Sequence, residues 1–228
     1  MKSTFSLLFA GLLTVVSPAE LFSQGSTIYA SVLSTKLFVV GAANPETGLY
    51  YQRSSEDTVW HHMGARNIRE FGVAVHTPSR GQLICLASGN GVHMTTDGGS
   101  TWKVTTGWQI TEVLTVTIDV ANPDFMLCGT PYGVFRTLDR GITWVECNNG
   151  ITQKFTSSVI IDHSNSSILY CSTEDGVYRS EDRGNTWKRT GLNVGGVRVV
   201  VQSPKDPNVL IAGTDDHGIY VTGNGGRY

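Results

Sequence analysis

The sequence predicts an all-β protein built from about five small antiparallel sheets, and three observations predict it. A box with the pattern [ST]-x-D-x-G-x-T-W recurs three times, and its tryptophans, Trp102, Trp144 and Trp187, are 42 and 43 residues apart. Short β-branched runs with period-two alternation lie between the boxes. Asn-Pro, Asp-Gly and Gly-Gly turn signals separate these runs. A repeat of about 40 to 45 residues that holds four strands is one blade of a β-propeller.

Each blade is expected to contain four strands in a fixed order. The first strands are β-branched runs at residues 27–32, 71–76, 113–119, 156–162 and 197–203, and the apolar second strands follow at 36–42, 82–88, 125–131, 168–174 and 209–215. The third strands begin at Gly48, Gly91, Gly133, Gly176 and Gly218, and the outer strands begin at the tryptophans, with Trp60 as the degenerate first member. Residues 222–228 match a box up to its Thr position, so we expect the last blade to lack its outer strand.

These strands divide the chain into blades at about residues 26–65, 66–108, 109–151, 152–193 and 194–228. Two interpretations of a chain with about five such blades stay open. The ring either closes with five blades, the last one frayed, or it is a fragment of a larger propeller, because an unpaired sheet edge is normally removed by closure.

The first 24 residues are predicted to be a secretory signal peptide. Lys2 precedes an apolar run from Phe5 to Val16, which is shorter than the roughly 20 residues that a membrane-spanning helix needs. Small residues suit cleavage after Ala19, and a cut near Gln24 is the alternative. We therefore expect export, to the periplasm or outside the cell, with no transmembrane span after signal removal and the propeller at residues 25–228. The alternative is a buried N-terminal helix.

Composition limits the classes of partner. The chain of 228 residues has 17 Lys and Arg against 19 Asp and Glu, a formal net charge of −2. A long polybasic groove is thereby excluded, and no nucleic-acid partner is expected. Hydrophobic residues make up 40% of the chain, enough to bury a core, and 26 Gly indicate many turns.

The box residues are predicted to be structural. Asp97, Asp139 and Asp182 can accept backbone N–H bonds across a tight turn, in which Gly99, Gly141 and Gly184 can take positive φ. The boxes lack the several acidic ligands of a calcium loop, so we expect no metal. Cys85, Cys128, Cys147 and Cys171 form no C-x-x-C pair and are expected to be small buried residues rather than disulfides.

On these boxes, the chain resembles the Asp-box (BNR-repeat) β-propellers over about residues 26–228. That class includes sialidases, sortilin-type receptors, xyloglucanase-type glycoside hydrolases and the photosystem II assembly-factor type. The resemblance to sialidases implies an Arg triad, a Tyr/Glu nucleophile pair and an R-[IVL]-P motif, but that motif does not occur here. The xyloglucanase type implies two acidic residues across a cleft, for which Glu174, Asp175, Asp215 and Asp216 are available.

Ligand contacts are expected on the face opposite the boxes, formed by the loops before each first strand and those joining second to third strands. Trp108 is the only Trp outside the repeat register, and an aromatic flanked by polar residues suits a sugar ring or a partner anchor. Its alternative is a ring folded down over the blade. The ligand-binding candidates are Trp108, Gln109, Tyr132, Arg66, Arg69, Arg198, Asp215 and His217.

Catalytic signatures such as G-x-S-x-G and H-E-x-x-H are missing from the sequence, and the loops are short. No catalytic residue and no cofactor are expected. We therefore favour a non-catalytic exported propeller, monomeric, that binds a protein or glycan ligand. One alternative is part of a glycan-processing enzyme of the sialidase or xyloglucanase type. Another is an assembly factor resembling the photosystem II type, which would hold an immature partner.

Overall fold

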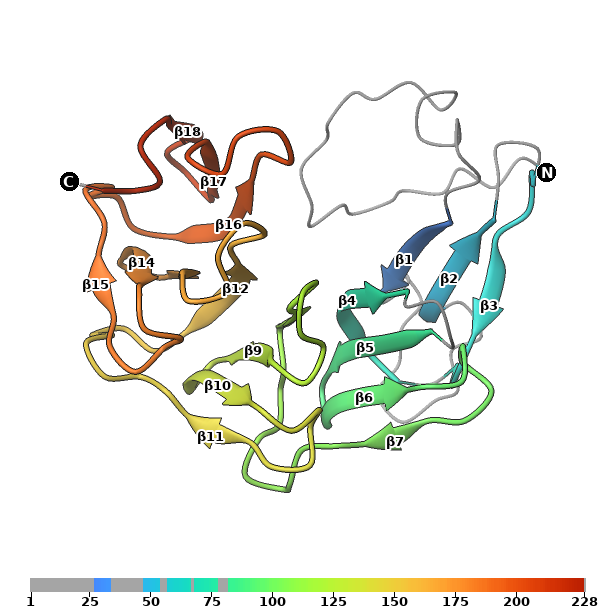
Figure 1. Ribbon diagram of the computed structural model, residues 1–228. Helices are drawn as coiled ribbons and strands as arrows, with labels where there is room; N and C mark the ends of the chain where they lie inside the picture. The colour runs from blue at the N-terminus through green and yellow to red at the C-terminus, as the bar shows by residue number, and fades with distance from the viewer. Residues whose placement is uncertain (1–26, 34–46, 54–56, 67, 78–81, 228) are drawn as a thin grey trace.

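The computed structural model describes residues 27–33, 47–53, 57–66, 68–77 and 82–227. These residues form 18 β-strands in five antiparallel sheets of three or four strands. The sheets follow one another around a common centre (Figure 1). The predicted all-β propeller fold is confirmed. No described segment forms a helix that could cross a membrane.

The second, third and fourth sheets each have four strands, and each strand pairs with the next one along the chain. The second sheet contains β4 (Glu70–His76), β5 (Leu83–Ser88), β6 (Gly91–Thr95) and β7 (Lys103–Val104). The third contains β8 (Thr115–Ile118), β9 (Met126–Thr130), β10 (Gly133–Thr137) and β11 (Val145–Glu146). The fourth contains β12 (Thr156–Ile161), β13 (Leu169–Thr173), β14 (Gly176–Ser180) and β15 (Lys188–Arg189).

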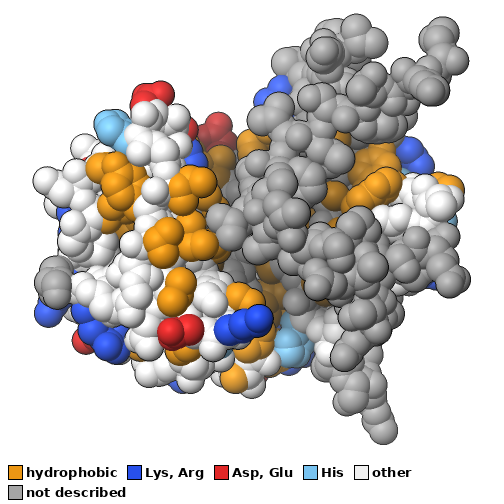
Figure 2. Space-filling view, turned by 90° about the horizontal axis from the view of Figure 1, so that it is seen from above, with side chains coloured by type: hydrophobic (Ala, Val, Ile, Leu, Met, Phe, Trp, Pro, Cys, Tyr) orange, Lys and Arg blue, Asp and Glu red, His pale blue; other side chains and the backbone are white. Residues whose placement is uncertain are grey.

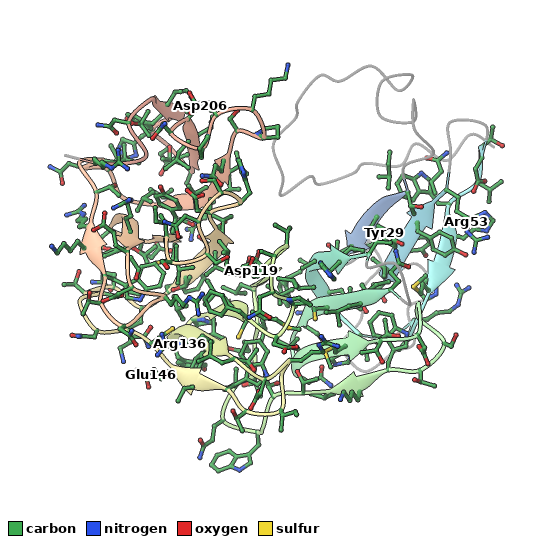
Figure 3. The ribbon with its side chains drawn as sticks, viewed as in Figure 1. Tyr29, Arg53, Asp119, Arg136, Glu146 and Asp206 are labelled. Atoms are coloured by element: carbon green, nitrogen blue, oxygen red, sulfur yellow. The ribbon has the colours of Figure 1, made fainter. Side chains whose placement is uncertain are left out.

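The first strands of these sheets lie inside and the fourth strands lie outside. Strand β8 packs on β4 and on β12, and β12 packs on β16, so consecutive first strands follow one another around the centre. In Figure 3, Asp119, which follows β8, lies near the middle, whereas Arg136 and Glu146 of β10 and β11 lie farther out. The inner and outer positions follow the strand order that the repeat predicts.

The last sheet contains only β16 (Val197–Gln202), β17 (Leu210–Thr214) and β18 (Ile219–Thr222). Strand β18 is therefore the outer edge strand of this sheet in the described part of the chain. Its side chains Ile219 and Val221 are 72% and 68% exposed, and hydrophobic side chains are visible on this side of the molecule (Figure 2). Three strands are what the sequence predicts for this blade.

The first sheet differs from its prediction. Strand β1 (Ile28–Val32) pairs directly with β2 (Gly48–Gln52), which pairs with β3 (His61–Met63). The expected second strand at residues 36–42 lies outside the described residues. Because β1 pairs with the strand that begins at Gly48, which is a third strand by its repeat position, β1 occupies the place of a second strand and not of a first.

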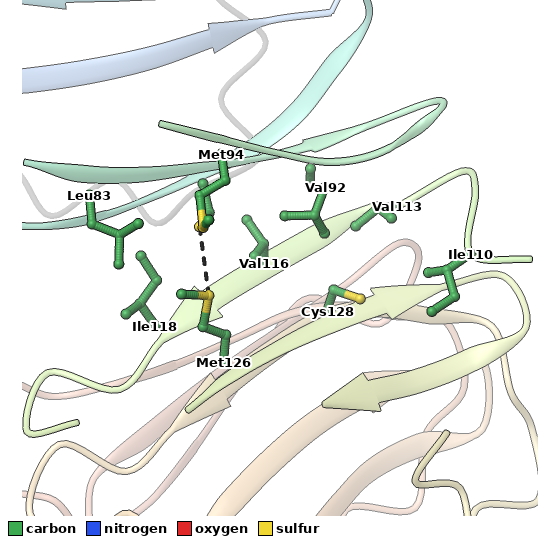
Figure 4. Packing of buried hydrophobic residues seen from close by; sticks show 11 residues of the cluster. Leu83, Val92, Met94, Ile110, Val113, Val116, Ile118, Met126 and Cys128 are labelled. Atoms are coloured by element: carbon green, nitrogen blue, oxygen red, sulfur yellow. Dashed lines mark hydrogen bonds between the residues drawn. The ribbon is translucent and has the colours of Figure 1, made fainter. Parts of the chain in front are cut away.

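The cores lie between neighbouring sheets. Between the second and third sheets, Leu83 and Met94 pack against Ile118 and Met126 (Figure 4). The thiol of Cys85 lies 3.7 Å from the sulfur of Met126 in the next sheet. All four cysteines are buried and free, which confirms that they act as small core residues.

The three box turns have the same hydrogen bonds. In the third sheet, Thr137 Oγ1 and Thr143 N donate to Oδ1 of Asp139 at 2.7 and 2.8 Å, and Thr143 Oγ1 donates to Oδ2 at 2.6 Å. Gly141 closes the turn at φ +80°, in the left-handed region that favours glycine. Asp97 with Gly99 and Asp182 with Gly184 repeat this geometry.

The three box tryptophans bury their indoles to different extents. Trp187 is 3% exposed and its Nε1 donates to the carbonyl oxygen of Cys147 in the preceding sheet at 2.7 Å. Trp102 donates within its own box, to the carbonyl of Gly99 at 3.0 Å. Trp144 packs against the core between the second and third sheets, and its Nε1 has no hydrogen-bond partner among the described residues.

Candidate functional site

Two kinds of connection lie at the same end of the sheets. One joins the second strand of a sheet to its third strand, and the other joins each sheet to the next. Backbone hydrogen bonds join them: Glu112 N donates to Gly89 O, Gly196 N donates to Glu174 O, and Asp215 N donates to Gly196 O, at 2.8 to 3.0 Å. The box turns lie at the opposite end because successive strands reverse direction. We call the first end the loop face; it comprises residues 64–66, 68–69, 89–90, 105–114, 131–132, 147–155, 174–175, 190–196 and 215–218.

Arg198, the second residue of β16, binds two acidic side chains of the loop face. Its Nη1 lies 2.5 Å from Oε1 of Glu174, and its Nη2 and Nε lie 2.6 and 2.7 Å from Oδ2 of Asp215. Its guanidinium carbon lies 5.6 Å from the ring centre of Phe155. These four residues, the Arg198 cluster, tie together loops of the fourth and fifth sheets.

The two carboxylates of the Arg198 cluster are engaged as ion-pair partners. The hydrogen bonds from Arg198 hold the pKa of Asp215 below its usual value, and the Asp215 and Glu174 carboxylates together raise the pKa of Arg198. Glycoside hydrolysis needs a carboxyl whose pKa is raised so that it can protonate a leaving group. The pairing with Arg198 works against that role for Asp215.

Asp175 is held by hydroxyl groups next to this cluster. Its Oδ2 accepts from Thr152 Oγ1 at 2.6 Å and from the Tyr178 hydroxyl at 2.9 Å, and its Oδ1 accepts from Thr173 Oγ1 at 2.7 Å. Partial burial raises the pKa of Asp175, but these hydrogen bonds outweigh it and the net pKa is lowered. Asp175 is therefore an ionised acceptor that braces the loop.

Two aromatic side chains of the loop face are exposed. Trp108 is 85% exposed, in a turn closed by a hydrogen bond from Ile110 N to Gly107 O at 3.0 Å. The alternative that its ring folds down over the blade is therefore wrong. Tyr132 is 55% exposed, and its hydroxyl donates to Oε2 of Glu112, in the same connection as Trp108, at 3.3 Å.

The other candidates are exposed on separate loops. Arg66 and Arg69 lie in the connection between β3 and β4, Gln109 follows Trp108, and His217 lies in the connection between β17 and β18. Among the predicted ligand-binding residues, the structure joins Arg198 to Asp215. In the described part of the chain, no hydrogen bond, ion pair or ring contact joins Trp108 or Tyr132 to Arg198. The same part holds no group of three or more His, Cys, Asp or Glu that could bind a metal ion.

Two residues escaped sequence reasoning. Phe155 lies beside the Arg198 guanidinium, and Glu70, the first residue of β4, is 1% exposed with no hydrogen-bond partner for its Oε2 in the described chain. Burial raises the pKa of Glu70 to about 8. An alignment of the repeats could have singled out Glu70. The uncharged residues Thr156 and Val197 start the corresponding strands β12 and β16, where Glu70 starts β4.

No model of a known protein family matches the chain, and no curated protein matches it. Solved structures do match. An ancestral GH74 enzyme matches with a TM-score of 0.58 and 23% identity over 75% of this chain and 25% of its own. The GH74 xyloglucanase from Xanthomonas campestris matches with a TM-score of 0.54 and 16% identity, over 82% of this chain and 42% of its own. A protein of the COPII outer coat vertex matches with a TM-score of 0.60 and 12% identity, over 78% of this chain and 52% of its own.

These matches concern the fold. The chain spans from a quarter to about half of the length of these structures. Enzymes and a coat protein share the propeller with this chain, so function has to be argued from the site. The comparisons therefore establish a β-propeller fold.

Proposed function

We propose that the chain is an exported, non-catalytic β-propeller that binds a glycan or a protein through the loop face. One observation carries the proposal: Glu174 and Asp215 share a single guanidinium, while Trp108 and Tyr132 expose aromatic rings on the same face. Paired carboxylates and exposed aromatic rings suit recognition better than proton transfer.

The exposed rings support a binding role on physical grounds. An indole that is 85% exposed to water costs free energy unless a partner covers it, and Trp and Tyr are enriched where binding energy concentrates. Their flat faces also stack on sugar rings, while the phenol and indole edges donate hydrogen bonds. The likeness in fold to a xyloglucanase makes xyloglucan the first glycan to test.

Export is part of the proposal and rests on residues 1–24, which lie outside the described residues. The positive start, the apolar run of Phe5 to Val16 and the small residues that follow are typical of a secretory signal. N-terminal sequencing of the secreted or periplasmic product tests this. A mature chain that starts near residue 20 to 25 supports export, and a chain found only in the cytoplasm with Met1 retained contradicts it.

The binding test compares Trp108→Ala with Ile142→Ala. Ile142 is 78% exposed but lies in a box turn, at the opposite end from the loop face. A glycan array and affinity capture from envelope extracts identify which class of partner binds. We expect Trp108→Ala to weaken that binding at least about tenfold, or roughly 1.4 kcal/mol, and Ile142→Ala to leave it unchanged. Equal binding by both variants would overturn the proposed site.

The enzyme alternative is tested separately. Purified protein is incubated with xyloglucan and with sialyl glycosides, and released sugars are measured. We expect no turnover. Hydrolysis that disappears in Glu174→Gln or Asp215→Asn would replace the binding proposal with an enzymatic one.

A further inference from the structure

A cavity of about 200 Å³ lies against the second sheet, beside the residues that follow β3 and apart from the Arg198 cluster. Gly64, Ala65 and Ile68, which follow β3, line one side of it, and residues of the second sheet line the other. The residues that matter for its chemistry are Ile68, Glu70, Leu86, His93, Trp102 and Lys103. Its walls are mostly apolar, and its ionisable groups are the Glu70 carboxyl, the His93 imidazole and the Lys103 ammonium.

The carboxyl of Glu70 is buried in this cavity, and no ion pair joins it to Lys103 or to another cation in the described part of the chain. Its Oε2 has no hydrogen-bond partner among the described residues. The basic groups nearby are His93 on β6, Lys103 on β7, and Arg66 and Arg69 on the connection from β3. None of these groups lowers the pKa of Glu70, which burial alone raises. A buried carboxylate in this state is costly unless a cation pairs with it.

The fold itself does not need a carboxyl at this place. Glu70 is the first residue of β4 and pairs with β5 ahead of a bulge. Thr156 and Val197 occupy the same place, ahead of the same bulge, in β12 and β16, and both are fully buried. In two other sheets, therefore, an uncharged residue at this position is compatible with the same strand and bulge.

His93 occupies the strand position that the larger ring of Tyr178 occupies in the fourth sheet. His93 pairs with Leu86 across β5 and β6, as Tyr178 pairs with Cys171 across β13 and β14. Tyr178 is 2% exposed in the core between the third and fourth sheets, with its hydroxyl 2.6 Å from Thr152 Oγ1. His93 is shorter and its Nε2 instead lies 2.7 Å from Asn90 Oδ1.

We propose that this cavity binds a small primary alkylammonium group, with the Glu70 carboxylate as its counter-ion and Trp102 and Leu86 as apolar walls. The ammonium supplies the positive charge that Glu70 lacks, and the indole adds a favourable surface for a cation. The volume is below the roughly 300–1,000 Å³ of drug-sized ligand sites. The ligand is therefore either a free short-chain amine or the end of a lysine side chain.

The test titrates the protein with ethylammonium chloride, with ethanol as the neutral analogue and Nα-acetyl-lysine amide as the lysine side-chain source. The indole N–H resonance of Trp102 reports binding. We expect ethylammonium to bind and ethanol to leave the resonance unmoved. Binding of the lysine amide as well assigns the site to lysine side chains, and its failure assigns the site to free amines.

The affinity for ethylammonium should depend on pH in one direction. Burial places the pKa of Glu70 at about 8, so the carboxylate is the main form above pH 8 and is protonated below it. Burial also lowers the pKa of His93, which favours the neutral imidazole. We expect the affinity to fall about 20-fold from pH 8.5 to 6.5. A flat profile would overturn the proposal.

Two variants separate the carboxyl from the cavity. Glu70→Thr introduces the residue of the fourth sheet and should melt cooperatively but bind ethylammonium at least about tenfold more weakly. His93→Tyr keeps Glu70 and fills the space, and it should also lose binding. Wild-type affinity in either folded variant contradicts the assignment. Glu70→Gln gives the same comparison with the side-chain shape retained.

Discussion

Trp187 donates its indole N–H to the backbone carbonyl of Cys147 at 2.7 Å, so a side chain of the fourth sheet is hydrogen-bonded to the end of the third. Trp144 occupies the same position in the preceding box, yet its Nε1 has no partner among the described residues. The two indoles therefore occupy equivalent positions in the repeat, and only that of Trp187 makes a hydrogen bond to the neighbouring sheet.

This pair yields the first prediction. Trp187→Phe removes a hydrogen bond and leaves the Cys147 carbonyl without its donor, while Trp144→Phe removes only packing. We expect Trp187→Phe to lower the free energy of unfolding by about 1 kcal/mol more than Trp144→Phe does. Urea denaturation of both variants measures this difference. Equal losses would mean that the hydrogen bond adds nothing to the stability of the interface.

The box carboxylates yield the second prediction. Hydrogen bonds to Asp139 from the Thr137 and Thr143 hydroxyls and from the backbone N–H of Thr143 lower its pKa to about 2. Because the folded pKa lies below the unfolded one, the stabilisation is present above about pH 4 and is lost as the pH falls toward 2. We expect Asp139→Asn to lower Tm at pH 7 by a few degrees and to flatten the decline of Tm between pH 4 and 2.

Asp216 provides the control for this variant. It is exposed on the loop face and has no hydrogen bond in the described chain. Asp216→Asn should leave the melting curve unchanged at each pH. Partner binding should be the same in Asp139→Asn as in the wild type. A variant with an intact melt and lost binding would show that the box turn belongs to the binding site.

The third prediction concerns the Arg198 cluster. Asp215 has a lowered pKa, first through hydrogen bonds from Arg198 and then through its charge. Replacing Arg198 by Ala should raise the pKa of Asp215 toward the ordinary range, so that the acid loss of stability linked to Asp215 becomes smaller. NMR titration of the carboxyl carbons measures the change. Arg140→Ala, which breaks only the ion pair with Asp124 on the other face, should leave Asp215 unaffected.

The repeat register predicts most of the fold because each strand is short, alternating and bounded by a turn. Thr137, Asp139 and Thr143 lie within seven residues, so their turn can be inferred from local spacing alone. The Arg198 cluster joins residues 24 and 17 positions apart on different loops. Their pairing depends on how neighbouring sheets pack, which spacing does not encode.

Two further features were not predicted, the place of β1 in its sheet and the burial of Glu70. Strand β1 matches the pattern of a first strand, but its pairing with β2 places it second, because alternation specifies a strand without specifying its neighbour. Glu70 reads as a surface residue by type, and its burial follows from the connection that covers it. Comparing it with Thr156 and Val197 would have identified the exception.

The last sheet provides the fourth prediction, because a cavity of about 260 Å³ adjoins β18. Val177 and Leu192 of the fourth sheet line it on one side, and Leu210 and Tyr220 of the fifth line it on the other. In the fourth sheet, the corresponding space between the third and fourth sheets holds the indole of Trp187.

The turn beside this cavity already has the box geometry. Thr222 Oγ1 donates to Asn224 Oδ1 at 2.6 Å, as Ser180 donates to Asp182. A Cβ on Gly226 would lie 3.2 Å from Thr190, just as one on Gly184 would lie 3.5 Å from Cys147. The position that follows Tyr228 therefore corresponds to that of Trp187, and the acceptor for its indole would come from the segment around Thr190.

Extending the chain after Tyr228 by Trp-Lys-Arg-Thr-Gly, the sequence that follows Thr186 here, should fill the cavity and pair with β18. We expect this extension to add about 1.5–3 kcal/mol to the free energy of unfolding, or about 2–4 °C in Tm for each kcal/mol. The matched control is Ser-Lys-Arg-Thr-Gly, which keeps the strand and omits the indole. Calorimetry of the two extended chains isolates the indole, and equal melting temperatures would show that the cavity does not accept it.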